Sequence, residues 1–193
     1  MYPLEADGRL GNASAILRLE GSGPHPRQES SHPHSVGISP DGRFAYVPDL
    51  GTDRVMIYQI DTLSGGLNPA GYANVPPGAG PRHMTFSADG RFAYVINELN
   101  STISAFRREP ESGQLDSLQL ISTLPEGFQG ESLCADIHLS RDGRFLYGSN
   151  RGHNSLAIFA VDTASGHLAA RGHEPTRGDF PRNFALSPDG TTL

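Results

Sequence analysis

Short stretches in which hydrophobic and polar residues alternate recur along the chain, and they run into Asp-Gly pairs. Alternation with a period of two residues is typical of a half-buried β-strand, and Asp-Gly between two such stretches is a strong signal for a β-hairpin. The stretches before the hairpins carry Val36 and Ile38, Met84 and Phe86, Ile137 and Leu139, and Phe184 and Leu186. The pattern predicts antiparallel hairpins with no helix between them.

One segment marks each hairpin. The residues from Ser39 to Val47 read Ser-Pro-Asp-Gly-Arg-Phe-Ala-Tyr-Val, and similar segments begin at Ser87, Ser140 and Ser187. The copies are about 50 residues apart, a period found in repeat proteins. The chain is therefore a repeat, and its fold follows from the contents of one copy.

Each copy contains four expected strands. After the hairpin strand, for example 92–96, a polar turn leads to a third strand at 54–60, 102–107 or 155–161. A Ser-Gly turn then precedes a weaker fourth strand, which opens at Leu67, Leu115 or Leu168. Four antiparallel strands in about 50 residues are the plan of a β-propeller blade. The absence of Trp argues against the WD40 type of propeller.

We therefore expect an all-β fold, a partial β-propeller with four-stranded antiparallel blades, forming one domain over 1–193. The expected divisions are the end of a blade at 1–24, complete blades at 25–76, 77–125 and 126–177, and the start of a blade at 178–193. Three complete blades and two partial ones cannot close a ring. The chain is thus expected to be a piece of a longer propeller.

Composition narrows the classes of function. All 15 basic residues are Arg, so chemistry that needs Lys, such as a Schiff base or a phosphate-binding lysine loop, is excluded, and we expect no cofactor. The net charge is −6 and the arginines are scattered, which argues against nucleic acid as a partner, and no apolar window is long enough for a membrane span. The single cysteine, Cys134, and the lack of a leader-like N-terminus favour a cytoplasmic protein.

Blade geometry brings two columns of residues to one mouth of the central channel. The hairpin reverses the chain, so the start of the first strand and the end of the second lie on the same rim. The first column is His34, Arg82, Ala135 and Arg182, and the second is Leu50, Glu98 and Arg151. Guanidinium groups bind carboxylate or phosphate, and a carboxylate or imidazole can move a proton, so the columns predict a site for a small anion. The alternative is that these are exposed rim positions that vary freely.

The segments Gly78-Ala79-Gly80-Pro81-Arg82-His83-Met84 and Asn97-Glu98-Leu99-Asn100-Ser101 closely resemble the seven-bladed propeller lactonases. That family includes bacterial 6-phosphogluconolactonases and fungal 3-carboxy-cis,cis-muconate lactonizing enzymes. The resemblance covers essentially the whole chain, including His32-Pro33-His34 and Pro181-Arg182-Asn183-Phe184. It implies an intact protein of about twice this length. The site residues it implies are His34 or His32, Arg82, Glu98 and Arg151, with His83 and Arg182 as further substrate contacts.

The leading hypothesis is hydrolysis of a small anionic sugar δ-lactone, 6-phosphogluconolactone, as in the pentose phosphate pathway. Arg82 and Arg151 would hold the phosphate or the oxyanion, and Glu98 or His34 would be the general base. No Gly-x-Ser-x-Gly motif is present, so water is expected to attack directly. The sequence says nothing about the oligomeric state.

Three other interpretations stay open. The same residue types could form a muconolactone, or the propeller could be a non-catalytic binding scaffold. A metal site at His25, His32 and His34 is disfavoured, because Pro33 interrupts the strand and the pattern defines no carboxylate partner. Asp136 and His138 share a strand face as a buried pair or as channel residues. The expected packing or solvated residues are Cys134, His153, His167 and His173.

Overall fold

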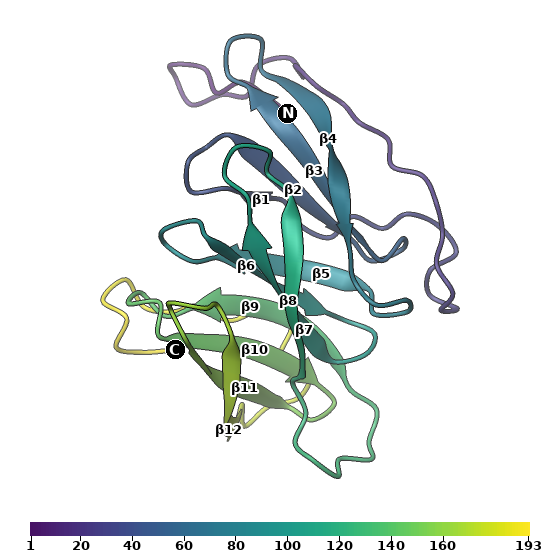
Figure 1. Cartoon of the computed structure of the whole chain (residues 1–193), viewed down its shortest axis with the longest axis vertical. Helices are drawn as coiled ribbons and strands as arrows, with labels where there is room; N and C mark the ends of the chain where they lie inside the picture. Colours follow the sequence, from purple (N-terminus) through teal and green to yellow (C-terminus); the bar gives the residue numbers. More distant parts are fainter.

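A computed structural model describes all 193 residues, and its regular structure consists of β-strands alone. Twelve strands form three four-stranded antiparallel sheets, and each sheet follows the chain order of its strands. Figure 1 shows the sheets stacked one on another from the blue N-terminal part to the yellow-green C-terminal part. The prediction of a partial β-propeller is confirmed. No helix capable of crossing a membrane is found.

The sheets have similar strand lengths, apart from the first strand. The first sheet consists of β1 (Gly37–Ile38), β2 (Phe44–Asp49), β3 (Arg54–Asp61) and β4 (Gly66–Asn74). The second consists of β5 (Pro81–Phe86), β6 (Phe92–Asn97), β7 (Thr102–Arg108) and β8 (Leu115–Ser122). The third consists of β9 (Leu133–Leu139), β10 (Phe145–Arg151), β11 (Ser155–Val161) and β12 (Leu168–Pro175).

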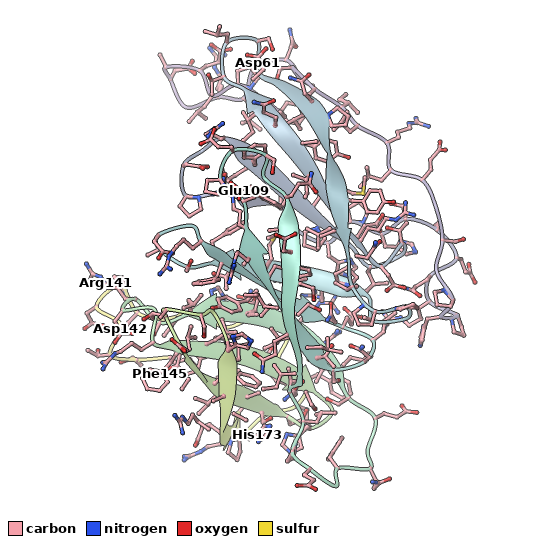
Figure 2. All side chains as sticks on the ribbon, in the orientation of Figure 1. Asp61, Glu109, Arg141, Asp142, Phe145 and His173 are labelled. Atoms are coloured by element: carbon pink, nitrogen blue, oxygen red, sulfur yellow. The ribbon has the colours of Figure 1, made fainter.

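The repeated Ser-x-Asp-Gly segment closes each hairpin through its own side chains. In the first copy the Ser39 hydroxyl donates to Asp41 Oδ1 at 2.6 Å and accepts the Phe44 N–H at 3.0 Å. Gly42 has a φ of 70°, a left-handed conformation that glycine adopts without steric cost. The other copies repeat this arrangement, and Figure 2 shows Arg141 and Asp142 of the third hairpin at the left margin of the molecule. The repeat is thus explained by local turn chemistry.

The core consists of two clusters, one on each face of the middle sheet. Successive side chains of a strand point to opposite faces. From β6, Ala93 and Val95 therefore join the cluster shared with the first sheet, whereas Tyr94 and Ile96 join the cluster shared with the third. Every residue of β6 is buried. This explains why β6 reads as a continuous hydrophobic run over 92–96, unlike an alternating strand with one face in water.

Polar ties also cross between neighbouring sheets. The Tyr46 hydroxyl donates to the Gly113 carbonyl at 2.7 Å, and the Tyr94 hydroxyl repeats this contact with Gly166 at 3.1 Å. Arg108 is buried and donates to the Tyr46 hydroxyl at 2.9 Å and to Asp41 Oδ2 at 2.6 Å. Arg108 is therefore a structural residue, and the repeat did not reveal this role.

The two ends of the chain depart from the repeat. Strand β1 has only two residues, and Ile38 within it and Val36 just before it are exposed. Phe184 and Leu186 form no strand, because no second strand lies beside them, although the Ser187 turn closes as in the other copies. The N-terminal segment, purple in Figure 1, runs along the outside of the first sheet, where the Ser14 hydroxyl donates to the Gly65 carbonyl at 2.8 Å.

Candidate functional site

Strand pairing aligns the two columns on one rim. Pro81 pairs with Asn97, and Leu133 pairs with Arg151, so the start of each inner strand lies beside the end of the next strand. Glu98 follows β6, and its N–H donates to the Gly80 carbonyl at 2.7 Å. Its carbonyl accepts the Cys134 N–H of the third sheet at 3.1 Å. The backbone of Glu98 is therefore fixed between two sheets.

Glu98 is the centre of a charge cluster. Its carboxylate is almost fully buried, and Oε2 lies 2.8 Å from Arg82 Nε and 2.9 Å from Arg151 Nη2. The other oxygen, Oε1, lies 2.6 Å from Arg27 Nη2. Arg82, Glu98 and Arg151, which the sequence placed on one rim, are thus brought together. Arg27 was not expected there.

Main-chain carbonyls fix the two inner arginines. Arg82 Nη1 donates to the Ala135 carbonyl at 2.6 Å, and Arg151 Nη2 donates to the Cys134 carbonyl at 2.8 Å. The Nε atoms of both arginines are buried without a hydrogen-bond partner, although Arg82 Nε forms an ion pair with Glu98 Oε2. These two side chains are rigidly placed and already committed to neighbours.

The cluster carries an excess of positive charge. Three guanidinium groups face one carboxylate, which leaves two positive charges without a partner among the charged side chains of the cluster. Burial opposes ionisation of Glu98, but Arg151, Arg27 and Arg82 outweigh it and lower the pKa of this carboxyl. A carboxylate stabilised in this way is a weak base. The cluster is suited to attract an anion.

His34 lies at the edge of the cluster, before β1. Its Nδ1 donates to the His32 carbonyl at 3.1 Å, so in the neutral ring Nε2 carries the lone pair. Nε2 lies 3.9 Å from Glu98 Oε2. Partial burial and the nearby Arg82 guanidinium lower the pKa of His34 from its ordinary value of 6.5. His34 is therefore neutral at neutral pH and has a free basic nitrogen.

A hollow of about 390 Å³ adjoins His34. Its lining residues are Pro26, Arg27, Glu29, His32, His34 and Leu50. The backbone of His32 is anchored by Asp49 Oδ1, which accepts its N–H at 2.6 Å. Pockets for small ligands are often of this volume or larger. The hollow brings His32 and His34 together with Arg27, beside the charge cluster.

His83 takes part in a hydrogen-bond chain behind the cluster. Its Nδ1 donates to the buried Asp136 at 2.8 Å, and its Nε2 accepts from Arg82 Nη1 at 3.0 Å. The other oxygen of Asp136 accepts from His138 at 3.0 Å and from Asn183 at 2.6 Å. Burial opposes ionisation of Asp136, but the two histidine bonds prevail and lower its pKa. Both ring nitrogens of His83 are occupied, so its position favours orienting Arg82 over touching substrate.

The remaining candidates lie elsewhere. Arg182 is exposed and makes no ion pair or hydrogen bond, although its positive charge helps to lower the pKa of Arg82, after burial as the main cause.

His25 accepts the Arg27 N–H on its ring nitrogen at 3.1 Å, and no group of three His, Cys, Asp or Glu residues is arranged to hold a metal ion. Burial raises the pKa of the Cys134 thiol to about 12. His173, labelled on β12 in Figure 2, donates to the Thr123 carbonyl at 2.8 Å and is thus not the solvated residue we expected.

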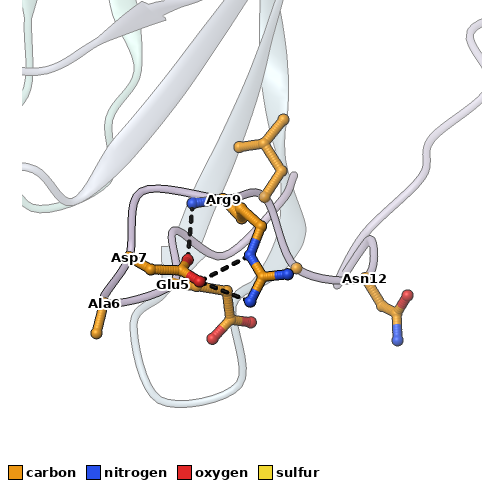
Figure 3. Close-up of a pocket in the computed structure, with 7 residues that line it drawn as sticks. Glu5, Ala6, Asp7, Arg9 and Asn12 are labelled. Atoms are coloured by element: carbon orange, nitrogen blue, oxygen red, sulfur yellow. Dashed lines mark hydrogen bonds and ion pairs between the residues drawn. The ribbon is translucent and has the colours of Figure 1, made fainter.

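Figure 3 shows a second hollow, of about 500 Å³, in the N-terminal loop. There Asp7 and Arg9 pair with each other at 2.6 Å, and both side chains are largely exposed. No histidine and no buried charge lie in its lining. The hollow beside His34 is the stronger candidate site.

Comparison with known proteins agrees with the fold. The sequence profile of the family described as "Lactonase, 7-bladed beta-propeller" matches residues 1–193. The chain belongs to this family. Among its lactonase relatives, the 6-phosphogluconolactonase of Bacillus subtilis is 37% identical over 188 residues, which cover 97% of this chain and 53% of the relative.

Two solved structures are also similar to this chain. The periplasmic gluconolactonase of Pseudomonas aeruginosa is 44% identical with a TM-score of 0.92, over 98% of this chain and 53% of that one. A protein from Lactobacillus plantarum is 39% identical with a TM-score of 0.92, over 98% of this chain and 54% of that one. The chain thus spans about half the length of the relatives it matches.

Proposed function

We propose that this protein is a lactonase that hydrolyses a small anionic sugar lactone. The observation that carries the proposal is the buried Glu98 with three guanidinium groups around it, beside a neutral histidine. Uncompensated positive charge in a partly buried site favours binding of an anion. The neutral His34 supplies a base for activating water.

In the proposed reaction His34 Nε2 takes a proton from water as the water oxygen attacks the lactone carbonyl. The new carbon–oxygen bond makes a tetrahedral oxyanion, which the fixed positive charge of Arg82 and Arg151 stabilises. Glu98 Oε2, 3.9 Å from Nε2, stabilises the imidazolium that forms. His34 then returns the proton to the ring oxygen as its bond to the carbonyl carbon breaks. The product is the open hydroxy acid.

The choice of His34 over Glu98 as the base follows from their charges. The arginines that lower the pKa of Glu98 make it a poor proton acceptor, whereas His34 is unprotonated and free on one nitrogen. Sequence reasoning left the two residues equal. Their surroundings support Glu98 as the charged anchor and His34 as the base.

The test is the pH profile of kcat/KM for lactone hydrolysis. Because burial lowers the pKa of His34 below 6.5, activity should be full above that pH and fall as pH drops through the lowered value. Replacing His34 by Gln should reduce kcat by about 10² to 10⁴ and remove this acid limb. The matched control is exposed His167→Gln. An unchanged rate and acid limb in His34→Gln would refute the assignment.

The finer assignment is to 6-phosphogluconolactone in the pentose phosphate pathway and to the cytoplasm. It is supported by the name of the Bacillus subtilis relative and by the single, buried cysteine. The Pseudomonas aeruginosa relative is named as a periplasmic gluconolactonase. The two relatives differ in whether the lactone they are named for is phosphorylated, so the groups that could recognise a phosphate decide the substrate.

A further inference from the structure

Arg27 lies on a loop before the first sheet, and the loop is firmly held. The next residue, Gln28, is fully buried. Its side-chain nitrogen donates to the Leu50 carbonyl and to Asp53 Oδ1, each at 2.7 Å, and its side-chain oxygen accepts the His25 N–H at 2.9 Å. Arg27 is therefore presented to Glu98 from an anchored loop.

Arg27 differs from the other two arginines in its exposure. Its side chain is 49% exposed, whereas those of Arg82 and Arg151 are 6% and 7% exposed. The side chain of Arg27 has Glu98 Oε1 as its one partner, through Nη2, whereas the inner arginines also bind main-chain carbonyls. A guanidinium carries five N–H donors, so Arg27 retains donors for a ligand.

Two hollows meet at Arg27. The hollow of about 390 Å³ contains His34, the proposed base. The other, of about 550 Å³, lies on the side of Leu99, Ser101 and Leu133 and is also lined by Arg27. A substrate with its carbonyl beside His34 would thus have a guanidinium within the same surface for a remote anionic group.

We propose that Arg27 binds the phosphate of a phosphorylated sugar lactone and so sets the preference for phosphorylated over unphosphorylated substrate. The proposal rests on the lactonase function proposed above. Phosphate is a doubly charged acceptor that a guanidinium can bind in bidentate fashion. The inner arginines then serve Glu98 and the reacting carbonyl, and recognition of the remote anion falls to Arg27.

The test is the ratio of kcat/KM for 6-phosphogluconolactone to kcat/KM for glucono-δ-lactone. Arg27 also supports Glu98, and loss of that support lowers both values alike and cancels in the ratio. We expect Arg27→Gln to lower the ratio by about 10- to 100-fold, the range of a charge-assisted hydrogen bond. Arg27→Lys, which keeps the charge, should restore part of the loss.

The matched control is Arg43→Gln. The side chain of Arg43 is exposed to a similar extent and pairs with Glu111 at 3.2 Å. Arg43 precedes β2, whereas the candidate site lies at the other end of that strand, so the ratio should stay at the wild-type value. A ratio that is unchanged in Arg27→Gln would overturn the proposal, since Arg27 would then only position Glu98. A wild-type ratio near one would also overturn it.

Failure of the lactonase function would look different. The wild-type protein would then hydrolyse neither lactone, and calorimetric titration with inorganic phosphate would test the anion site alone. Phosphate binding that weakens at least about 10-fold in Arg27→Gln, but not in Arg43→Gln, would support the site. Absence of phosphate binding, or equal binding by both variants, would refute it.

Discussion

Replacing Glu98 by Gln should destabilise the protein far more than an ordinary surface change. The substitution keeps the size of the side chain and removes its charge. One oxygen of the carboxylate faces the guanidinium groups of Arg82 and Arg151 at 2.8 and 2.9 Å. An amide has one oxygen and one NH₂ group, so its donor would face either Arg27 or the two buried guanidinium groups, and in both orientations the negative charge is lost.

The magnitude follows from the burial of each partner. Breaking a buried ion pair by removing one member costs about 3 to 5 kcal/mol, because the other charge is left without compensation. The pairs of Arg82 and Arg151 with Glu98 belong to this class. Arg27 is half exposed, so its pair adds less than about 1 kcal/mol. We therefore expect Glu98→Gln to lower the free energy of unfolding by about 3 to 5 kcal/mol.

The assay is urea unfolding at neutral and acidic pH. The arginines hold the pKa of Glu98 below its ordinary value of 4.5, so its stabilising effect is present above that pH and is lost as pH falls through the lowered value. The difference between wild type and Glu98→Gln should shrink over the same range. The control is Glu111→Gln, an exposed partner of Arg43, for which a change within about 0.5 kcal/mol is expected.

A second substitution distinguishes the anchor from other roles. The double variant Glu98→Gln/Arg151→Met should recover stability relative to Glu98→Gln, because it removes one of the buried charges left unpaired. The reasoning is refuted if the free energy of unfolding of Glu98→Gln is within about 1 kcal/mol of the wild-type value. If that stable variant also loses the acid limb of activity, Glu98 and not His34 is the base.

Two further predictions concern the contacts between sheets. Arg108→Met should lower the free energy of unfolding by about 2 to 3 kcal/mol. This is less than the full cost of breaking a buried ion pair, because Asp41 keeps contact with water. A shift in urea midpoint no larger than that of Arg43→Gln would contradict the prediction. Gly113→Ala should lower the free energy of unfolding more than Gly143→Ala does, although the φ values of the two glycines are similar, 74° and 70°. A Cβ atom at Gly113 would lie 2.5 Å from the Phe44 ring, whereas a Cβ atom at Gly143 would meet only a side-chain atom at 4.0 Å. Equal urea midpoints for the two glycine variants would show that only backbone strain matters.

The sequence predicts the strands because the signals for them are local. A serine, an aspartate and a glycine close each hairpin through bonds within six residues, so the motif identifies the turn wherever it occurs. The strand through Phe184 and Leu186 is the instructive failure, since a strand also needs a neighbour to pair with. Local turn chemistry is thus enough to place the hairpins, but strand pairing depends on the rest of the chain.

The rim residues were predictable for a geometric reason. A hairpin returns the chain to the rim from which it started, so Arg82, Glu98 and Arg151 could be placed at one opening without knowledge of their contacts. Their pairing could not be predicted, because the sequence gives residue types and not distances. The shared Oε2 of Glu98, which makes that residue an anchor, is visible only in the structure.

The position of Arg27 could not be predicted from the sequence repeat. It lies outside the repeated strands, and Gln28 sets its position by bonding Leu50 and Asp53, which are more than twenty residues away in sequence. Arg108 was missed for a related reason, since its partners Tyr46 and Asp41 belong to the neighbouring repeat. A signal that could have helped is a polar residue at an otherwise buried position, because such residues are buried only with partners.

The geometry of the charge cluster depends on how the sheets pack against one another. The cluster takes its side chains from four segments of the chain. These are the loop with Arg27, the segment before β1 with His34, the second sheet with Arg82 and Glu98, and the third sheet with Arg151. Because Glu98 also bonds through its backbone to the third sheet, a shift between sheets would change the distances in the cluster. The excess positive charge repels within the cluster until an anion is bound, so ligand binding should tighten the contact between the second and third sheets.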